Sequence, residues 1–182
     1  MTTEYSKIKW IEAGYEFFAL HGPDHIQVEK LARNLNLNKS GFYHYFGDRD
    51  VFTEELLDLH KERIEVFARK ITPLKNYDEY IHLIVNNKIT TLFHVQLSRN
   101  RNIAEFNKTL DYTNSLIFPK ISPLWSEYAG MSHHPEIAMR FFYQLIGVFV
   151  KSVNAQNLTY DFISAMSKDA ILLLKQIQKT RN

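Results

Sequence analysis

The residues best suited to chemistry lie together in the segment 38–46, which reads Asn-Lys-Ser-Gly-Phe-Tyr-His-Tyr-Phe. Gly41 within a helix costs about 1 kcal/mol relative to alanine, so its position predicts close approach to another surface. The major groove of DNA is wide enough to admit an α-helix. The alternative is a surface turn with core aromatic residues. The segment offers one cation and four polar side chains for base edges and phosphates: Lys39, Ser40, Tyr43, His44 and Tyr45.

Eight histidines raise the question of a metal site. Gly22-Pro23 breaks the helix between His21 and His25, and the neighbours His133 and His134 cannot face one site on a helix. The chain has no cysteine, which excludes disulfides and thiolate metal sites. It also has no phosphate-binding loop, nucleophile elbow or metalloprotease motif. We therefore expect no metal, no cofactor and no enzymatic activity, with an enzyme using an aromatic C-terminal cavity as the weaker alternative.

The composition is that of a globular protein, with 45% hydrophobic and 23% charged residues among 182. No apolar run is long enough for a membrane span or a signal core, and the lack of cysteine suits the cytoplasm, where we expect the protein. The net charge is only +2, and the first 50 residues hold six Lys or Arg against seven Asp or Glu. If this part binds DNA, it must use a local basic face.

Two helices must position the segment 38–46. Apolar residues at three- and four-residue spacing predict a helix over residues 5–21, which Gly22-Pro23 ends. A second compact apolar face predicts a helix over residues 28–35. The three-residue break that follows begins with Asn36, a residue type that tolerates left-handed backbone. Two short helices joined by such a turn predict a helix-turn-helix.

The ends of the segment carry their own signals. Asn38 is expected to cap the third helix with its side chain, and Asp48 is expected to cap a fourth helix that runs to about residue 71. Arg49 then lies in the first turn of that helix, where a cation opposes the helix dipole. An external phosphate would suit both Arg49 and the free N–H groups of the helix start. The alternative is a solvated Arg49 paired with Asp48 or Asp50.

Taken together, these features over residues 5–60 resemble the N-terminal domain of the TetR-type (tetracycline-repressor) family of bacterial transcriptional regulators. The aromatic-rich third helix followed by a basic and an acidic residue is the distinctive part. The matching residues are Trp10-Ile11, Ala13-Gly14, Phe17-Phe18 and Gly22, then Val28 and Leu31-Ala32, then Leu37 to Phe46, then Asp48-Arg49-Asp50 and Phe52.

The sequence also departs from the family pattern. Gln27 stands where the family usually has a Ser or Thr that caps the second helix and contacts phosphate. Glu29 stands where a basic or neutral residue often faces the DNA backbone. Asn36 replaces the frequent turn glycine, and Arg49 replaces the commoner lysine while keeping its charge.

The rest of the chain is also predicted to be helical, so the fold class is all-α. The predicted helices are 77–98, 103–118 ending at Pro119, a short segment between Pro123 and Gly130, 135–153 and 161–178. We expect an N-terminal three-helix DNA-binding domain over residues 1–48 and a C-terminal regulatory and dimerisation domain over residues 49–182.

The last two helices are apolar on more than one face, which predicts burial in a core or against a partner. The family resemblance implies that they pair with a second copy as a four-helix interface; the alternative is the core of a single chain. The residues expected at this interface are Phe141, Leu145, Val148, Phe149, Phe162, Met166, Ala170, Leu173 and Ile177.

The resemblance also implies a pocket for an effector, lined by the aromatic residues of the middle of the chain, although such residues at helical spacing more often form plain core. With no acidic or basic cluster there, the effector is expected to be neutral or hydrophobic. The candidate lining residues are Phe93, Gln96, Phe106, Tyr112, Trp125, Phe142 and Tyr143.

The sequence thus predicts a DNA-binding transcriptional regulator, a ligand-responsive homodimeric repressor on a palindromic double-stranded operator. The residues expected at the DNA are Lys39, Ser40, Gly41, Tyr43, His44, Tyr45 and Arg49. The alternative is a helical small-molecule-binding or scaffold protein with a degenerate DNA-binding domain, which the acidic balance of residues 1–50 and the presence of Gln27 and Glu29 favour.

Overall fold

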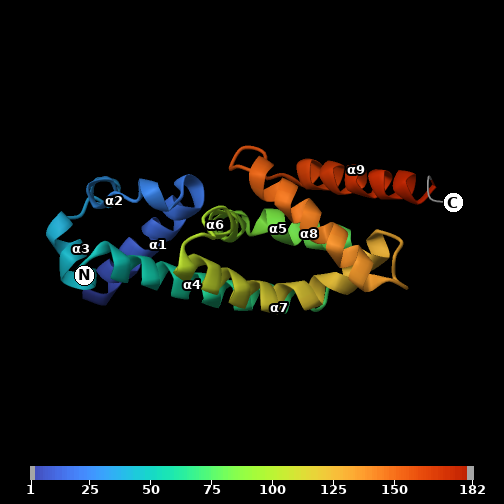
Figure 1. The fold of residues 1–182 in the computed structure, drawn as a ribbon. Coiled ribbons are helices and arrows are strands. Elements are labelled where there is room, and N and C mark those ends of the chain that lie inside the picture. The colour runs from blue at the N-terminus through green and yellow to red at the C-terminus, as the bar shows by residue number, and fades with distance from the viewer. Residues whose placement is uncertain (1–2, 180–182) are drawn as a thin grey trace. The chain divides into compact units, whose positions relative to one another are not determined.

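The computed structural model describes residues 3–179, and the side chains of residues 5–176 (Figure 1). These residues form helices and contain no strand, which confirms the all-α prediction. None of the described helices is long and apolar enough to cross a membrane. The helices are α1 (Thr3–His21), the 3-10 helix η1 (Pro23–His25), α2 (Val28–Leu35), α3 (Lys39–Phe46), α4 (Arg49–Ile71), α5 (Tyr77–Asn86), α6 (Lys88–Arg99), α7 (Ala104–Tyr128), α8 (Pro135–Ser152) and α9 (Tyr160–Lys179).

The chain forms two compact units that are discontinuous in sequence. The first holds the described residues up to Ile64 together with Ile89–Tyr112. The second holds Glu65–Lys88 and the described residues from Thr113 onward. Helices α4 and α7, and α6 through its first residue Lys88, therefore have residues in both units. The two units are defined by contacts within the chain and not by function. The predicted boundary at residue 48, between a DNA-binding and a regulatory domain, therefore stays a prediction.

An aromatic cluster forms the core of the first unit beneath α3. The buried ring of Phe42 lies edge-on to Trp10 of α1, with 5.4 Å between centroids, and 4.9 Å from Phe52 of α4. Phe46 lies 4.8 Å from Phe52. A Cβ at Gly14 would lie 2.2 Å from the Cζ atom of Phe52, so the absence of a side chain at Gly14 makes room for the Phe52 ring. The cluster fixes α3 on α1 and α4.

The second unit has its own aromatic core, with Trp125 fully buried at its centre. The Trp125 ring lies 5.1 Å from Tyr77 of α5 and 5.3 Å from Phe142 of α8. Its Nε1–H donates to the carbonyl of Ala138 at 2.8 Å, which satisfies the one polar atom of the indole. Burial raises the pKa of the Tyr77 hydroxyl well above its usual value.

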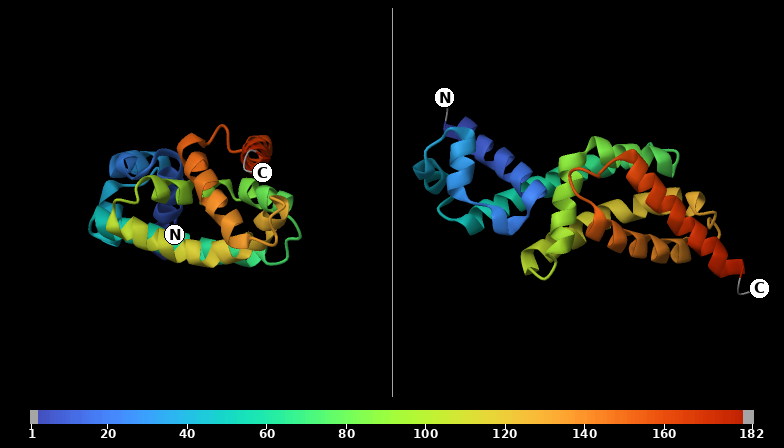
Figure 2. Two further views of the ribbon diagram at one scale, coloured as in Figure 1. Left: turned by 45° about the vertical axis from the view of Figure 1, so that its right-hand side comes forward. Right: turned by 90° about the horizontal axis from the view of Figure 1, so that it is seen from above.

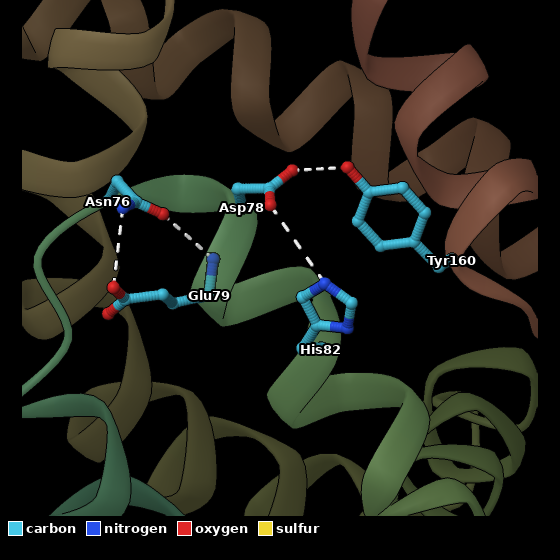
Figure 3. Close-up of polar contacts among 5 residues, drawn as sticks. All are labelled: Asn76, Asp78, Glu79, His82 and Tyr160. Carbon is cyan, nitrogen blue, oxygen red and sulfur yellow. Dashed lines mark hydrogen bonds and ion pairs between the residues drawn. The ribbon is translucent and has the colours of Figure 1, made fainter.

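A polar cluster ties α5 to the start of α9 (Figure 3). The Tyr160 hydroxyl donates to Asp78, and the Tyr160 ring stacks on His82 with 4.6 Å between centroids. Nε2 of His82 lies 3.9 Å from the other carboxylate oxygen of Asp78. Asn76 caps α5, because its side-chain oxygen accepts from the Glu79 N–H at 2.9 Å. Figures 1 and 2 show α8 and α9 joined by the loop that precedes Tyr160.

Two predicted boundaries are wrong. Residues 77–98 form two helices, because the Asn87 side chain donates to the Leu83 carbonyl at 2.7 Å and competes with the backbone ladder. Helix α7 continues through Pro119 and Pro123, where a stop was expected. These prolines are four residues apart on one exposed face, where water can satisfy the carbonyls that lose an N–H partner.

Candidate nucleic-acid interface

Helix α3 has one buried face and one exposed face. Phe42 and Phe46 point into the core. The side chains of Lys39, Ser40 and His44 are exposed, and Tyr43 is 47% exposed. Gly41 and Tyr45 are half-buried. The structure therefore brings six of the seven residues predicted for DNA together on a single short helix, four of them open to solvent.

Gly41 is not required by packing within the chain. A Cβ at this position would lie 3.9 Å from Cε2 of Tyr45 and 4.0 Å from Nε1 of Trp10, which are ordinary contacts. Nor does its backbone have a positive φ. Packing among the described residues therefore does not account for a helix-weakening glycine at this position, and close approach of Gly41 to a partner stays a prediction.

The turn before α3 has the predicted geometry. Asn36 adopts left-handed backbone, with φ 54° and ψ 43°, and the Leu37 N–H donates to the Ala32 carbonyl at 2.9 Å. Gln27 makes no side-chain capping bond at α2, as expected of a glutamine. The prediction that Asn38 caps α3 with its side chain is wrong. The start of α3 is exposed, so water or a ligand can satisfy its N–H groups without a cap.

Asp48 caps the N-terminus of α4 with its side chain, as predicted. The Asp48 carboxylate oxygen accepts from the N–H groups of Asp50 and Val51, both at 2.9 Å. A phosphate cannot use those two donors without displacing Asp48. Arg49, next to Asp48 in the chain, is exposed, so its guanidinium is the group that remains to bind a phosphate there.

An ion pair on the exposed side of the helix-turn-helix was not foreseen. Nζ of Lys39 lies 2.9 Å from Oε1 of Glu29 in the first turn of α2. The hydrogen bond between them lowers the pKa of the Glu29 carboxyl and raises that of the Lys39 ammonium. The only sequence signal was Glu29 itself, an acid where the resemblance implies a basic or neutral residue.

Two further cations, Lys7 and Lys9, lie on α1. Nζ of Lys7 lies 2.6 Å from Oε1 of Glu55 in α4 and 5.7 Å from the centroid of the Phe46 ring. Lys9 lies over the ring of Tyr5, at 4.5 Å. Lys7 is thus engaged with α4, while Lys9 has no carboxylate partner among the ion pairs described.

Residues 11–56 match the sequence profile of bacterial regulatory proteins of the tetR family. The N-terminal domain belongs to the tetR family. The profile spans the whole helix-turn-helix and the start of α4. This confirms the resemblance over the helix-turn-helix and the start of α4.

Solved structures share the fold of this chain. One is a transcriptional regulator of the TerR/AcrR family from Aquifex aeolicus VF5, with 16% identity, a TM-score of 0.56, and coverage of 94% of this chain and 98% of the other. Another is a proposed TetR-family transcriptional regulator from Mesorhizobium loti MAFF303099, with 10% identity, a TM-score of 0.53, and coverage of 97% and 98%. No curated protein sequence matches significantly.

A buried polar network links α1 of the TetR-type domain to α4 and α6. The Tyr15 hydroxyl is hydrogen-bonded to Nδ1 of the fully buried His60 at 2.8 Å. Nε2 of His60 lies 3.3 Å from Nδ1 of His94. Arg63 lies over the Tyr15 ring at 4.1 Å and pairs with Glu12. Sequence spacing gave no sign of this network, because its members are tens of residues apart.

The candidate effector residues are divided between the two units. Phe93, Gln96, Phe106 and Tyr112 belong to the first unit, and Trp125, Phe142 and Tyr143 belong to the second. Phe93 is stacked 4.2 Å from both Tyr15 and Phe18, as core residues are. The exposed members are Tyr112 and Tyr143. Their role in a TetR-type effector pocket stays a prediction.

The predicted interface residues of α8 and α9 differ in exposure. Leu145 is buried within its own chain, whereas Val148 is 54% and Leu173 60% exposed. Leu172, which the prediction omitted, is 57% exposed. The side chain of Ile177 lies outside the described residues. The half-buried members are Phe141, Phe149, Phe162, Met166 and Ala170.

Within residues 5–176, no group of three potential ligands is arranged to hold a metal ion.

Proposed function

We propose that this TetR-type regulator is a homodimeric repressor that inserts α3 into the major groove of a palindromic operator. The observation that carries the proposal is Gly41, a helical glycine that packing does not require, at the centre of an exposed polar surface. Lys39 contacts a base edge or phosphate. Ser40 and Gly41 allow close approach of the helix backbone.

The remaining contacts flank that point. Tyr43 reaches a phosphate or a thymine methyl group, and His44 contacts a base edge or phosphate. Tyr45 is half-buried and supports the exposed face. Arg49 binds the DNA backbone through its guanidinium, because Asp48 already occupies the N–H groups of its helix. Few cations take part, so the salt dependence of binding is modest for a DNA-binding protein.

A second copy of the chain covers the exposed apolar side chains of α8 and α9. Val148, Leu172 and Leu173 are each more than half exposed, which favours a partner surface over solvent. A symmetric dimer presents two copies of α3 and therefore requires two half-sites about 34–36 Å apart, or multiples of that spacing.

An effector that is neutral or hydrophobic regulates this binding. Helix α4 carries Arg49 at its first residue and continues to Ile71, so a change in its tilt moves a DNA contact. To release DNA, the effector must bind the non-DNA conformation more tightly, with a typical coupling of about 1–3 kcal/mol. A compound that changes both thermal stability and operator affinity is the expected sign of this regulation.

Selection of binding sites from random duplex DNA tests the proposal. The expected product is an inverted repeat. The wild-type protein should shift this DNA in a gel, and the double variant Lys39→Ala, Tyr43→Ala should not. Enrichment of no sequence would contradict the proposal and favour the helical scaffold with a degenerate DNA-binding domain. Unchanged retention by the double variant would refute the roles assigned to these two residues.

A further inference from the structure

We propose that Glu29 is a positioning residue: its carboxylate holds the Lys39 ammonium in an ion pair until operator DNA displaces the carboxylate. The pair thereby lowers the affinity of the protein for non-cognate DNA. The inference rests on the proposed contact of Lys39 with DNA. It assigns a specificity role to a residue of α2 that itself makes no contact with a base.

The geometry places an acid among the cations of the DNA-binding surface. Oε1 of Glu29 lies 2.9 Å from Nζ of Lys39, and both side chains are at least half exposed. The positive charge of Arg49 also acts on the Glu29 carboxyl. Glu29 is therefore paired with one of the cations that the proposed function assigns to DNA, and a second, Arg49, acts on it electrostatically.

The surroundings of Glu29 keep its carboxylate ionised. It is the second residue of α2, and a carboxylate in the first helical turn is stabilised by the helix dipole. The hydrogen bond from Lys39, a backbone hydrogen bond and the neighbouring cations all lower its pKa. The carboxylate is thus charged at neutral pH, when DNA arrives.

A phosphate and the Glu29 carboxylate compete for the same ammonium group. If Lys39 keeps its pair, the phosphate meets a carboxylate 2.9 Å from the cation that it needs. If the pair opens, Lys39 gains a DNA contact, but the carboxylate is left facing a polyanion. Both routes weaken the sequence-independent attraction that dominates non-specific binding. The operator provides base contacts that offset the opening of the pair, and other sequences do not.

Neutralising Glu29 while keeping its shape tests this inference. Glu29→Gln is compared with wild type by fluorescence anisotropy on the selected operator and on a random duplex, across a salt series. We expect the random duplex to bind severalfold more tightly and the operator to gain less, so that the specificity ratio falls. The magnitude of the slope of log K against log[salt] should rise by about 0.9 per subunit for each freed cation.

Glu62→Gln is the matched control, with the same change of charge on an exposed residue of α4. It lies thirteen residues beyond Arg49, which is about 20 Å along a helix at 1.5 Å per residue. This control should leave both affinities near wild type. Equal effects of the two variants would show that the loss of any surface carboxylate changes DNA affinity, which would overturn the inference.

A double-variant cycle identifies Lys39 as the group through which Glu29 acts. In a Lys39→Gln background, Glu29→Gln should change the random-duplex affinity much less than in wild type. With Lys39 present, Glu29→Asp keeps a carboxylate and should retain part of the specificity that Glu29→Gln loses. Additive effects, or weaker operator binding by Glu29→Gln alone, would overturn the role. A wild-type protein that binds no duplex at all would instead refute the proposed function.

Discussion

The hydroxyl of Tyr15 and Nδ1 of His60 lie 2.8 Å apart in the core of the first unit, on helices α1 and α4. His60 is fully buried, and both of its ring nitrogens have partners, because Nε2 faces His94. Burial, and then the nearby His94 and Arg63, hold the pKa of His60 well below its ordinary value of 6.5. Glu12 and the Arg63 guanidinium are the other charged groups at Tyr15.

This burial predicts that the protein loses stability in mild acid. The folded protein keeps His60 neutral, whereas the unfolded chain binds a proton there below about pH 6.5. The unfolded state therefore holds more protons, and the free energy of unfolding falls as the pH falls, by up to about 1.4 kcal/mol per pH unit. Urea denaturation between pH 7.5 and 5.5, a window chosen around the histidine pKa, measures this slope.

The variant His60→Gln should be less stable at neutral pH, because it disturbs a buried hydrogen bond, yet its stability should depend less on pH. His25→Gln changes an exposed histidine and is the matched control, which should keep the wild-type slope. A wild-type slope that survives in His60→Gln would show that other groups cause the acid sensitivity.

A second prediction concerns Gly14, whose missing side chain makes room for Phe52. A Cβ there would lie 2.2 Å from Cζ of Phe52, within a core that cannot yield freely. Gly14→Ala should therefore destabilise the fold by about 1–3 kcal/mol. Adding Phe52→Leu should recover part of the loss, because it removes the ring atoms that collide. If Gly14→Ala is as stable as wild type in chemical denaturation, the packing described here is wrong.

Gly41 predicts the opposite pattern. A Cβ meets only ordinary contacts there, so Gly41→Ala should fold at least as stably as wild type, with a gain of up to about 1 kcal/mol. Operator affinity should nevertheless fall by about tenfold or more, the loss expected when one good base contact is removed. Thermal melting and gel shift on the same preparation separate the two effects. Normal operator binding by this variant would remove the argument for close approach.

Local signals in the sequence were sufficient for the helix-turn-helix and for α4. The predicted ranges 28–35 and 49–71 agree with α2 and α4, because glycine, proline, asparagine and aspartate residues mark their ends. The break at Asn87 was missed, since whether an asparagine side chain bonds to its own helix depends on its surroundings. Pro119 and Pro123 misled the prediction because a helix can continue through prolines on an exposed face.

The site was predictable in its residue types and less so in its contacts. That α3 presents Lys39, Ser40 and Tyr43 outward follows from the helical period, once Phe42 and Phe46 are placed inside. The pairing of Lys39 with Glu29 depends on the angle between two helices, which residue spacing does not determine. Contacts between residues far apart in sequence, such as Tyr15 with His60, were beyond any local pattern.

The last prediction concerns the exposed apolar side chains of α8 and α9. Leu173 is 60% exposed, so a charge there should not disturb the fold of one chain but should be costly at a covered interface. Wild type should scatter light as a particle of twice the 21.5 kDa chain mass, and Leu173→Glu as a single chain with unchanged helical content. Leu20→Glu, at a 37% exposed leucine of α1, should remain dimeric and serves as control. Operator affinity should fall in Leu173→Glu, because one α3 can read only one half-site. A monomeric wild type, or a dimeric Leu173→Glu, would show that these leucines do not form the interface.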